Sequence, residues 1–220
     1  MERHFQHELE GVKTNLIKMG SAVEENINNA VIAILERNEV IAAKVIESDK
    51  RIDTLEIEID NAIIDMLALQ QPVASDLRFI IAAQKINNDL ERIGDHAVNL
   101  AESALTLQKS KKLESLLEIP QMVSATKLML KYALDSFILL DPKMARIVLE
   151  TDDQIDEWNR SMTTNVIELL KNDKQLIEPG LALIRISQNL ERVADMATNI
   201  AEEVIFHIQA LVVKHHAEEI

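Results

Sequence analysis

Residues 86–102 read INNDLERIGDHAVNLAE, and residues 186–202 read ISQNLERVADMATNIAE. The two segments are identical at nine of 17 positions and lie 100 residues apart. A second match lies upstream at an offset of 103, between residues 42–53 and 145–156. Repetition over such a distance is typical of a duplicated supersecondary unit. The change of offset indicates a three-residue difference in the turn that precedes the repeated segment in each half.

Apolar residues in both segments follow a helical pattern. From Phe79 and from Leu183 they recur at alternating intervals of four and three residues, as in helices packed nearly parallel in a bundle. The chain has only four Gly and four Pro, and 3% of its residues are aromatic. This composition disfavours an architecture of strands and turns. The sequence therefore predicts an all-α fold.

Start and stop signals divide the chain into six helices. Asn38, Ser75 and Asp141 are the expected N-caps, the last followed by a proline that suits the first helical position. The duplication groups the helices into two three-helix bundles, residues 1–108 and 119–220, joined by a charged linker. The expected boundaries are Arg3–Glu36, Asn38–Leu69 and Ser75–Gln108 in the first half, and starts at Pro120, Asp141-Pro142 and Glu178-Pro179 in the second, with the last helix ending near His215.

Charge and composition exclude several classes of protein. A net charge of −14 disfavours binding to nucleic acid, and the absence of cysteine excludes disulfides, zinc ribbons and thiol catalysis. The longest charge-free stretches run ten residues, whereas a transmembrane helix needs about 20. No signal peptide is visible at the N-terminus. We therefore expect a cytoplasmic protein that inserts no segment into the membrane and reaches it only through partners.

Each half carries two pairs of carboxylates spaced four residues apart, which places each pair on one helix face. Hard and borderline cations such as Mg²⁺, Mn²⁺ and iron accept oxygen ligands of this kind. The pairs lie on the flank of the apolar seam or far from it, so a metal site there would be shallow. A solvated acidic face explains the same pattern. The candidate metal ligands are Asp49, Asp53, Glu91 and Asp95 in the first half and Asp152, Asp156, Glu191 and Asp195 in the second.

Signatures of catalysis are missing from the chain. Its four glycines form neither a dinucleotide-binding loop nor a P-loop, and no Glu-x-x-His motif of a di-iron oxidase occurs. Three hypotheses stay open: a regulatory adaptor that presents acidic faces to partner proteins, a carboxylate-bridged metal enzyme with oxidase-like activity, and a structural helical protein. The missing motifs favour a protein that is not an enzyme.

The repeated segment L-E-R-[IV]-[GA]-D-x-A-x-N-[IL]-A-E and the turn from Gln70 to Arg78 resemble the PhoU family of bacterial phosphate-transport accessory proteins. The resemblance covers nearly the whole chain. It implies a cytoplasmic negative regulator of phosphate uptake and phosphate-starvation signalling. Such a regulator links the ATPase subunit of a phosphate ABC transporter to a sensor histidine kinase. Family members can carry metal ions on [DE]-x-x-x-D motifs, which implies Fe, Mn, Mg or Zn at the eight carboxylates.

Two further expectations concern asymmetry and association. Gly94 and His96 of the first half correspond to Ala194 and Met196 of the second, so His96 is a candidate nitrogen ligand in the first half only. Ile57 and Ile59 fall on different sides of one helix, and we expect one of them to be exposed. An exposed apolar helix face predicts a weak homodimer.

Overall fold

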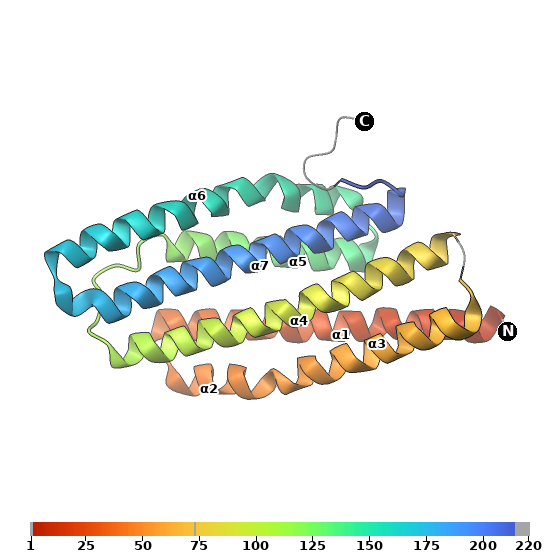
Figure 1. Cartoon of the computed structure of the whole chain (residues 1–220), viewed down its shortest axis with the longest axis horizontal. Coiled ribbons are helices and arrows are strands. Elements are labelled where there is room, and N and C mark those ends of the chain that lie inside the picture. Colours follow the sequence, from red (N-terminus) through yellow and green to blue (C-terminus); the bar gives the residue numbers. More distant parts are fainter. Residues whose placement is uncertain (1, 73, 214–220) are drawn as a thin grey trace.

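The computed structural model describes residues 2–72 and 74–213, and in these residues it contains helices and no strand. Figure 1 shows the helices running roughly along the long axis of the molecule. The elements are α1 (Glu2–Glu36), α2 (Glu39–Ser48), α3 (Lys50–Gln70), α4 (Ala74–Lys109), α5 (Ile119–Leu139), α6 (Pro142–Asn172), a short 3₁₀ turn η1 (Lys174–Leu176) and α7 (Ile177–Gln209).

These helices form the two predicted three-helix bundles. In the first, α1 packs against α2, α3 and α4, and in the second, α5, α6 and α7 pack against one another. The bundles meet mainly along α4 and α7, which run side by side in Figure 1, and α1 also touches α5. The fold class is therefore confirmed. The domain limits 1–108 and 119–220 stay a prediction.

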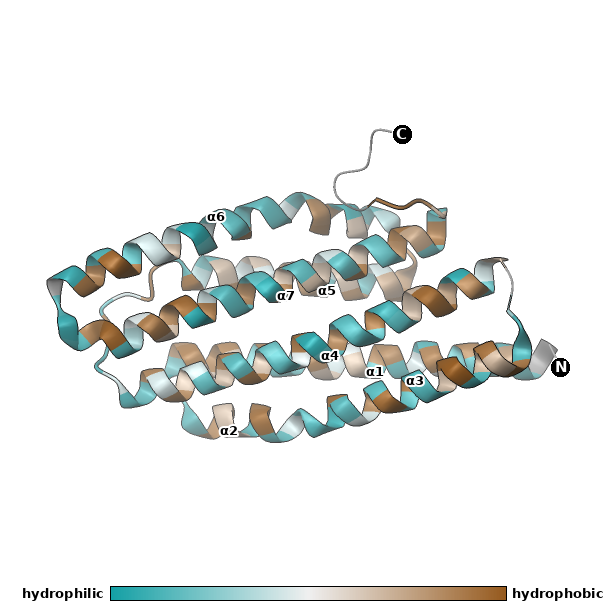
Figure 2. Ribbon diagram, in the orientation of Figure 1, coloured by the Kyte–Doolittle hydropathy of each residue, from teal (hydrophilic) through white to brown (hydrophobic). Residues whose placement is uncertain are grey.

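The predicted seams form the core of each bundle. Figure 2 shows hydrophobic residues interspersed with hydrophilic ones along α4 and α7, as expected of helices with one buried face. Ile86, Leu90 and Ile93 are fully buried on α4, and so are Ile186 and Leu190 at the repeated positions on α7. Among the described residues, no helix is long and apolar enough to cross a membrane.

Two of the three predicted caps are present. The Asn38 side chain accepts hydrogen bonds from the backbone N–H groups of Val40 and Ile41, and Asp141 accepts one from Lys143. The predicted cap at Ser75 is wrong, because α4 already begins at Ala74 and includes Ser75. Both confirmed caps supply a side-chain oxygen to N–H groups that have no partner within the helix.

Two other helix boundaries differ from the prediction. The second expected helix is interrupted at Asp49, which separates α2 from α3 although its own backbone is helical. The last helix ends at Gln209 instead of near His215, because Ala210 adopts a left-handed backbone and donates its N–H to Phe206 O. His215 itself lies outside the described residues. A left-handed residue at this place is a common way to end a helix.

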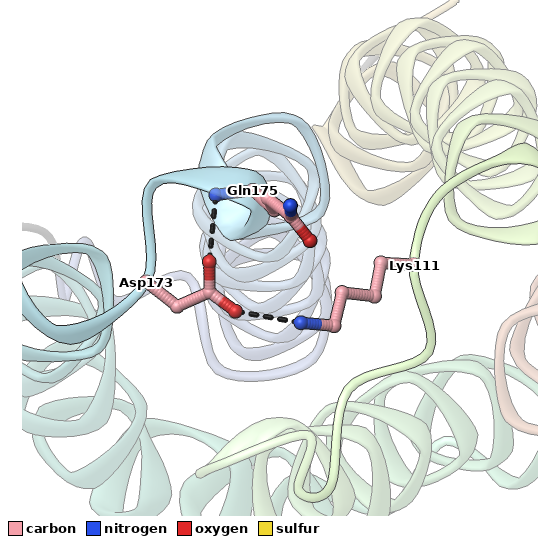
Figure 3. A network of polar contacts seen from close by, with 3 residues as sticks. All are labelled: Lys111, Asp173 and Gln175. Carbon is pink, nitrogen blue, oxygen red and sulfur yellow. Dashed lines mark hydrogen bonds and ion pairs between the residues drawn. The ribbon is translucent and has the colours of Figure 1, made fainter.

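The start of the segment between the bundles is held by charged groups of both bundles. Lys111 Nζ lies 2.6 Å from Asp173 Oδ2, and Asp173 Oδ1 accepts a hydrogen bond from the Gln175 N–H (Figure 3). The bond from Lys111 lowers the pKa of Asp173. On the first bundle, the Arg37 guanidinium donates to the carbonyl oxygens of Gln108 and Ser110, at the end of α4. The linker is therefore tied to the first bundle and to the turn before α7.

Candidate metal-binding faces

The first acidic face lies where the α2–α3 junction and α3 pack against α4 (Figure 1). Asp49 stands at the junction, Asp53 on α3, and Glu91 and Asp95 on α4. Burial, and then the charges of Asp53 and Asp95, raise the pKa of Asp49 to about 6. The four predicted carboxylates of the first half are therefore close enough to interact electrostatically across the two elements.

Glu91 is the most strongly affected carboxylate of this face. Burial raises its pKa to about 7, together with the charges of Asp95, Glu56, Asp53 and Asp49. The sequence analysis missed Glu56. Its own pKa is raised by burial and by Asp60, Asp53 and Asp95. The available signal was its spacing, because Glu56 lies three residues after Asp53 and so shares its helix face.

Gly94 lets the α2–α3 junction approach α4 closely. A Cβ atom at this position would lie 3.0 Å from Asp49 Oδ1 and 3.1 Å from Ile52 Cδ1, and real Cβ contacts are rarely so short. Asp49 Oδ1 is buried and has no hydrogen-bond partner among the described residues. A buried carboxylate oxygen without a donor is costly, and a bound cation would remove this cost.

The second acidic face lies between α6 and α7. One oxygen of each of Asp156, Glu191 and Asp195 lies within 4.8 Å of the others. Burial, followed by the charges of Glu191, Asp152 and Asp156, raises the pKa of Asp195 to about 7. Burial and Asp156 raise that of Glu191, whereas Arg192 acts in the opposite direction. The structure therefore brings three of the four predicted carboxylates of this half together.

Asp152, the fourth predicted ligand of this half, is held differently from its counterpart Asp49. Its Oδ1 accepts a hydrogen bond of 3.3 Å from the Thr198 hydroxyl, whereas the first half has Val98 at the equivalent position. α6 also runs without interruption through Asp152, while the first half breaks at Asp49. The two faces thus have carboxylates at corresponding positions and differ in how one of them, Asp49 or Asp152, is held.

His96, the candidate nitrogen ligand of the first half, has one ring nitrogen engaged by the other bundle. His96 is buried between α4 and α7, and its Nδ1 lies 2.8 Å from Asn189 Oδ1. Asn189 Nδ2 donates to Arg185 O, so its Oδ1 faces His96, and His96 Nδ1 carries the proton of this bond. Burial lowers the pKa of His96. The imidazole therefore joins the two bundles instead of facing the carboxylates.

The second face has the closer set of ligands for a cation near the surface, because among the described residues only Asp156, Glu191 and Asp195 bring three ligand oxygens within 4.8 Å of one another. Asp53, Asp95 and Asp195 are exposed, whereas Asp49 and Glu91 are half-buried, which agrees with the shallow position expected from the helical pattern. The donors are carboxylate oxygens, the ligands that Mg²⁺, Mn²⁺ and iron accept. The unpartnered Asp49 oxygen and the close oxygens of the second face fit such an ion.

Fold and site together define an all-α protein of two repeated three-helix bundles, each with an acidic face. The pattern that describes the PhoU domain matches this chain twice, at residues 16–104 and 119–204. The starts are 103 residues apart and the ends 100, which agrees with the change of offset in the sequence. The chain belongs to the PhoU family.

Relatives with this domain cover nearly the whole chain. A Thermotoga maritima protein named phosphate-specific transport system accessory protein PhoU homolog 1 is 38% identical over 92% of this chain and 88% of its own length. A PhoU homolog from Aquifex aeolicus is also 38% identical, over 96% of each chain. The crystal structure of PhoU from Pseudomonas aeruginosa superposes with a TM-score of 0.90 at 34% identity, covering 94% of this chain and all of that one.

Proposed function

We propose that this chain is an accessory protein of phosphate-specific transport. It acts in the cytoplasm as a negative regulator of phosphate uptake and phosphate-starvation signalling. The observation that carries the proposal is the pair of PhoU domains in this chain. Its relatives are named as accessory proteins of this transport system. The resemblance further suggests two partners, the ATPase subunit of the transporter and a sensor histidine kinase.

Deletion of the gene tests this function directly. In the host organism grown with ample phosphate, loss of a negative regulator raises phosphate uptake and switches on a phosphate-starvation reporter. Re-expression of the intact chain restores both to the wild-type level. Unchanged uptake and reporter signal in the deletion strain contradict the proposal. Pull-down of the purified chain with the ATPase subunit and with the cytoplasmic part of the kinase then tests each partner separately.

An enzymatic role has no support in the residues. The chain contains no Glu-x-x-His motif, and the candidate faces are shallow and carry no nucleophile paired with a base. We therefore assign no catalytic residue. Oxidase and phosphatase assays on metal-loaded protein test this assignment, and turnover that disappears with a substitution at Glu191 contradicts it.

The two acidic faces are proposed metal sites of this regulator. Asp49, Asp53, Glu91 and Asp95 would hold an ion in the first half, and Asp156, Glu191 and Asp195, with Asp152 beside them, in the second. A bound cation offsets the repulsion between these carboxylates and joins neighbouring helices. Their oxygen donors favour Mg²⁺, Mn²⁺ or iron, and Zn²⁺ is the fourth candidate. Metal analysis of protein purified without chelator measures which ion is held and how many per chain.

We also propose that the chain forms a weak homodimer. Ile59 is fully buried and Ile57 is 59% exposed, which confirms that one of the two isoleucines faces solvent. Ile64, two helical turns further along α3, is equally exposed, so the helix presents an apolar stripe that a second copy can cover. Sedimentation equilibrium tests the dimer. A single monomer mass at all concentrations contradicts it.

A further inference from the structure

The outward face of α5 combines an exposed leucine, two lysines and a nearby tryptophan. Leu128 is 46% exposed and stands between two shallow hollows of the surface. One hollow is mainly apolar and extends from Leu128 to the partly buried Trp158 of α6. The other is lined by Lys127 and Lys131 of α5 and by Glu24 and Asn28 of α1. We call Lys127, Leu128, Lys131 and Trp158 the α5 patch.

The internal repeat allows each residue of the patch to be compared with the corresponding residue of the first half. At the offset of 103, α5 aligns with α1, and four of the aligned pairs are identical: Met19 with Met122, Ser21 with Ser124, Ala22 with Ala125 and Ala30 with Ala133. All four positions of the patch differ between the halves. Lys127 replaces Glu24, Leu128 replaces Glu25, Lys131 replaces Asn28, and Trp158 replaces Leu55.

The three-helix bundle does not require the side chains of the α5 patch. The first half forms the same three-helix bundle with two carboxylates where the second half has Lys127 and Leu128. Packing of the bundle therefore does not demand a lysine or an exposed leucine there. A half-exposed leucine gains little from the fold, because much of its apolar surface stays in water. The patch is better explained by contact with another molecule.

We propose that the α5 patch is a docking site for an amphipathic helix of a partner protein that carries aspartate or glutamate beside its apolar side chains. Lys127 and Lys131 lie one helical turn apart and form no ion pair with any residue that the structure describes. They flank Leu128 in a chain whose net charge is −14. The patch thus pairs an apolar contact with two lysines beside one carboxylate, Glu24. The remaining excess of positive charge is complemented by an acidic amphipathic helix.

Size and charge limit the partner further. The exposed stripe from Gln121 to Lys131 rises about 15 Å along α5, enough for about three turns of a docked helix. The remaining surface is acidic, and salt screens charges beyond about 8 Å at physiological ionic strength. The lysines therefore attract carboxylates only at contact distance, so the acidic groups of the partner must lie on the docking helix itself. The inference does not depend on the metal sites or on the identity of the partner.

Trp158 makes docking measurable, because it is the only tryptophan of the chain. The probes are three synthetic helical peptides of about 15 residues with the same apolar face and with glutamate, glutamine or lysine on the flanks. Each is titrated into the full-length protein while the emission of Trp158 is recorded. We expect the acidic peptide to bind tightest, with a blue shift of the emission and weaker binding at high salt. Equal affinity for the three peptides, or no binding of the acidic one, overturns the proposal.

Variants taken from the first half test the patch itself. The double substitution Lys127→Glu with Lys131→Asn copies Glu24 and Asn28, and we expect it to weaken the acidic peptide about tenfold. Leu128→Glu copies Glu25, removes the apolar contact and is expected to weaken the acidic and the glutamine peptides. The matched control, Lys44→Glu with Lys143→Asn, changes the net charge equally at two exposed lysines outside the patch and should leave binding unchanged.

Two further outcomes contradict the proposal. One is equal loss of binding in the control and in the patch variant, which assigns the effect to net charge alone. The other is a blue shift of Trp158 emission that follows protein concentration without any peptide and disappears with Lys127→Glu and Lys131→Asn. That result assigns the patch to contact between copies of this chain. Circular dichroism of every variant verifies that the helices are intact before affinities are compared.

Discussion

Neutralising Glu91 tests whether the first acidic face is destabilised by its own charge. Glu91→Gln keeps the shape of the side chain and removes a carboxylate whose pKa is raised to about 7. At pH 8 the folded protein keeps this group ionised at a cost that the unfolded chain does not have. The bare pKa difference corresponds to about 3 kcal/mol. Because Glu91 is half-exposed and water screens its charge, we expect a gain of about 1 kcal/mol in the free energy of unfolding.

Thermal and urea denaturation at pH 8 measure this gain. Without metal, the gain corresponds to a rise in Tm of about 2–4 °C for a chain of this size. With Mn²⁺ at about 100 times its Kd, a site stabilises the native protein by about 2.7 kcal/mol. The variant should lose this response in the first half and bind about one ion fewer by calorimetry. The control is Glu102→Gln, an exposed carboxylate further along α4. Identical behaviour of the two variants, with and without Mn²⁺, refutes the reasoning and leaves a solvated acidic face.

Three other predictions concern the acidic faces and the contact between the bundles. The pKa values of Glu91 and Asp195 are raised, so the folded state binds more protons than the unfolded chain. Urea denaturation should therefore show that metal-free protein loses stability as the pH rises from about 4 to about 7, and Mn²⁺ should reduce this loss. Gly94→Ala increases helix propensity but places a Cβ 3.0 Å from Asp49 Oδ1. We expect a net loss of about 1 kcal/mol in the free energy of unfolding, together with weaker Mn²⁺ binding. A variant more stable than the wild type contradicts this. His96→Met leaves the buried Asn189 Oδ1 without its hydrogen-bond donor. We expect urea denaturation to show a loss of about 1–3 kcal/mol in the free energy of unfolding. An unchanged free energy contradicts a stabilising role of this bond.

The repeat, the seams and two of the caps could be predicted from the sequence because each depends on local spacing. Alternating intervals of four and three residues fix which side chains face the core, and Asn38 and Asp141 act on N–H groups two or three residues away. The proximity of the carboxylates within each half was also predictable in outline. This proximity follows from the carboxylate pairs, which lie on adjacent helices at matching positions of the repeat.

The features that sequence reasoning missed depend on contacts between helices. The break at Asp49 lies opposite Gly94 on α4, a pairing that no local pattern reveals. His96 follows Asp95 directly in the chain, yet one residue advances about 100° around a helix, enough to turn the imidazole toward α7. Ser75 was a sound cap by residue type, but α4 already begins at Ala74.

The bond between His96 and Asn189 has a consequence for the history of the chain. In the internal repeat, at the offset of 100, His96 corresponds to Met196 and Asn189 to Asp89. Two copies of the first half would oppose His96 with an aspartate, whose carboxylate can also accept the bond. Two copies of the second would oppose Asn189 with a thioether, which has no proton to donate. The second half alone therefore cannot rebuild the bond that joins the bundles in the intact chain. The two halves have thus diverged at this contact, and the second half depends on the first for the proton donor that joins them.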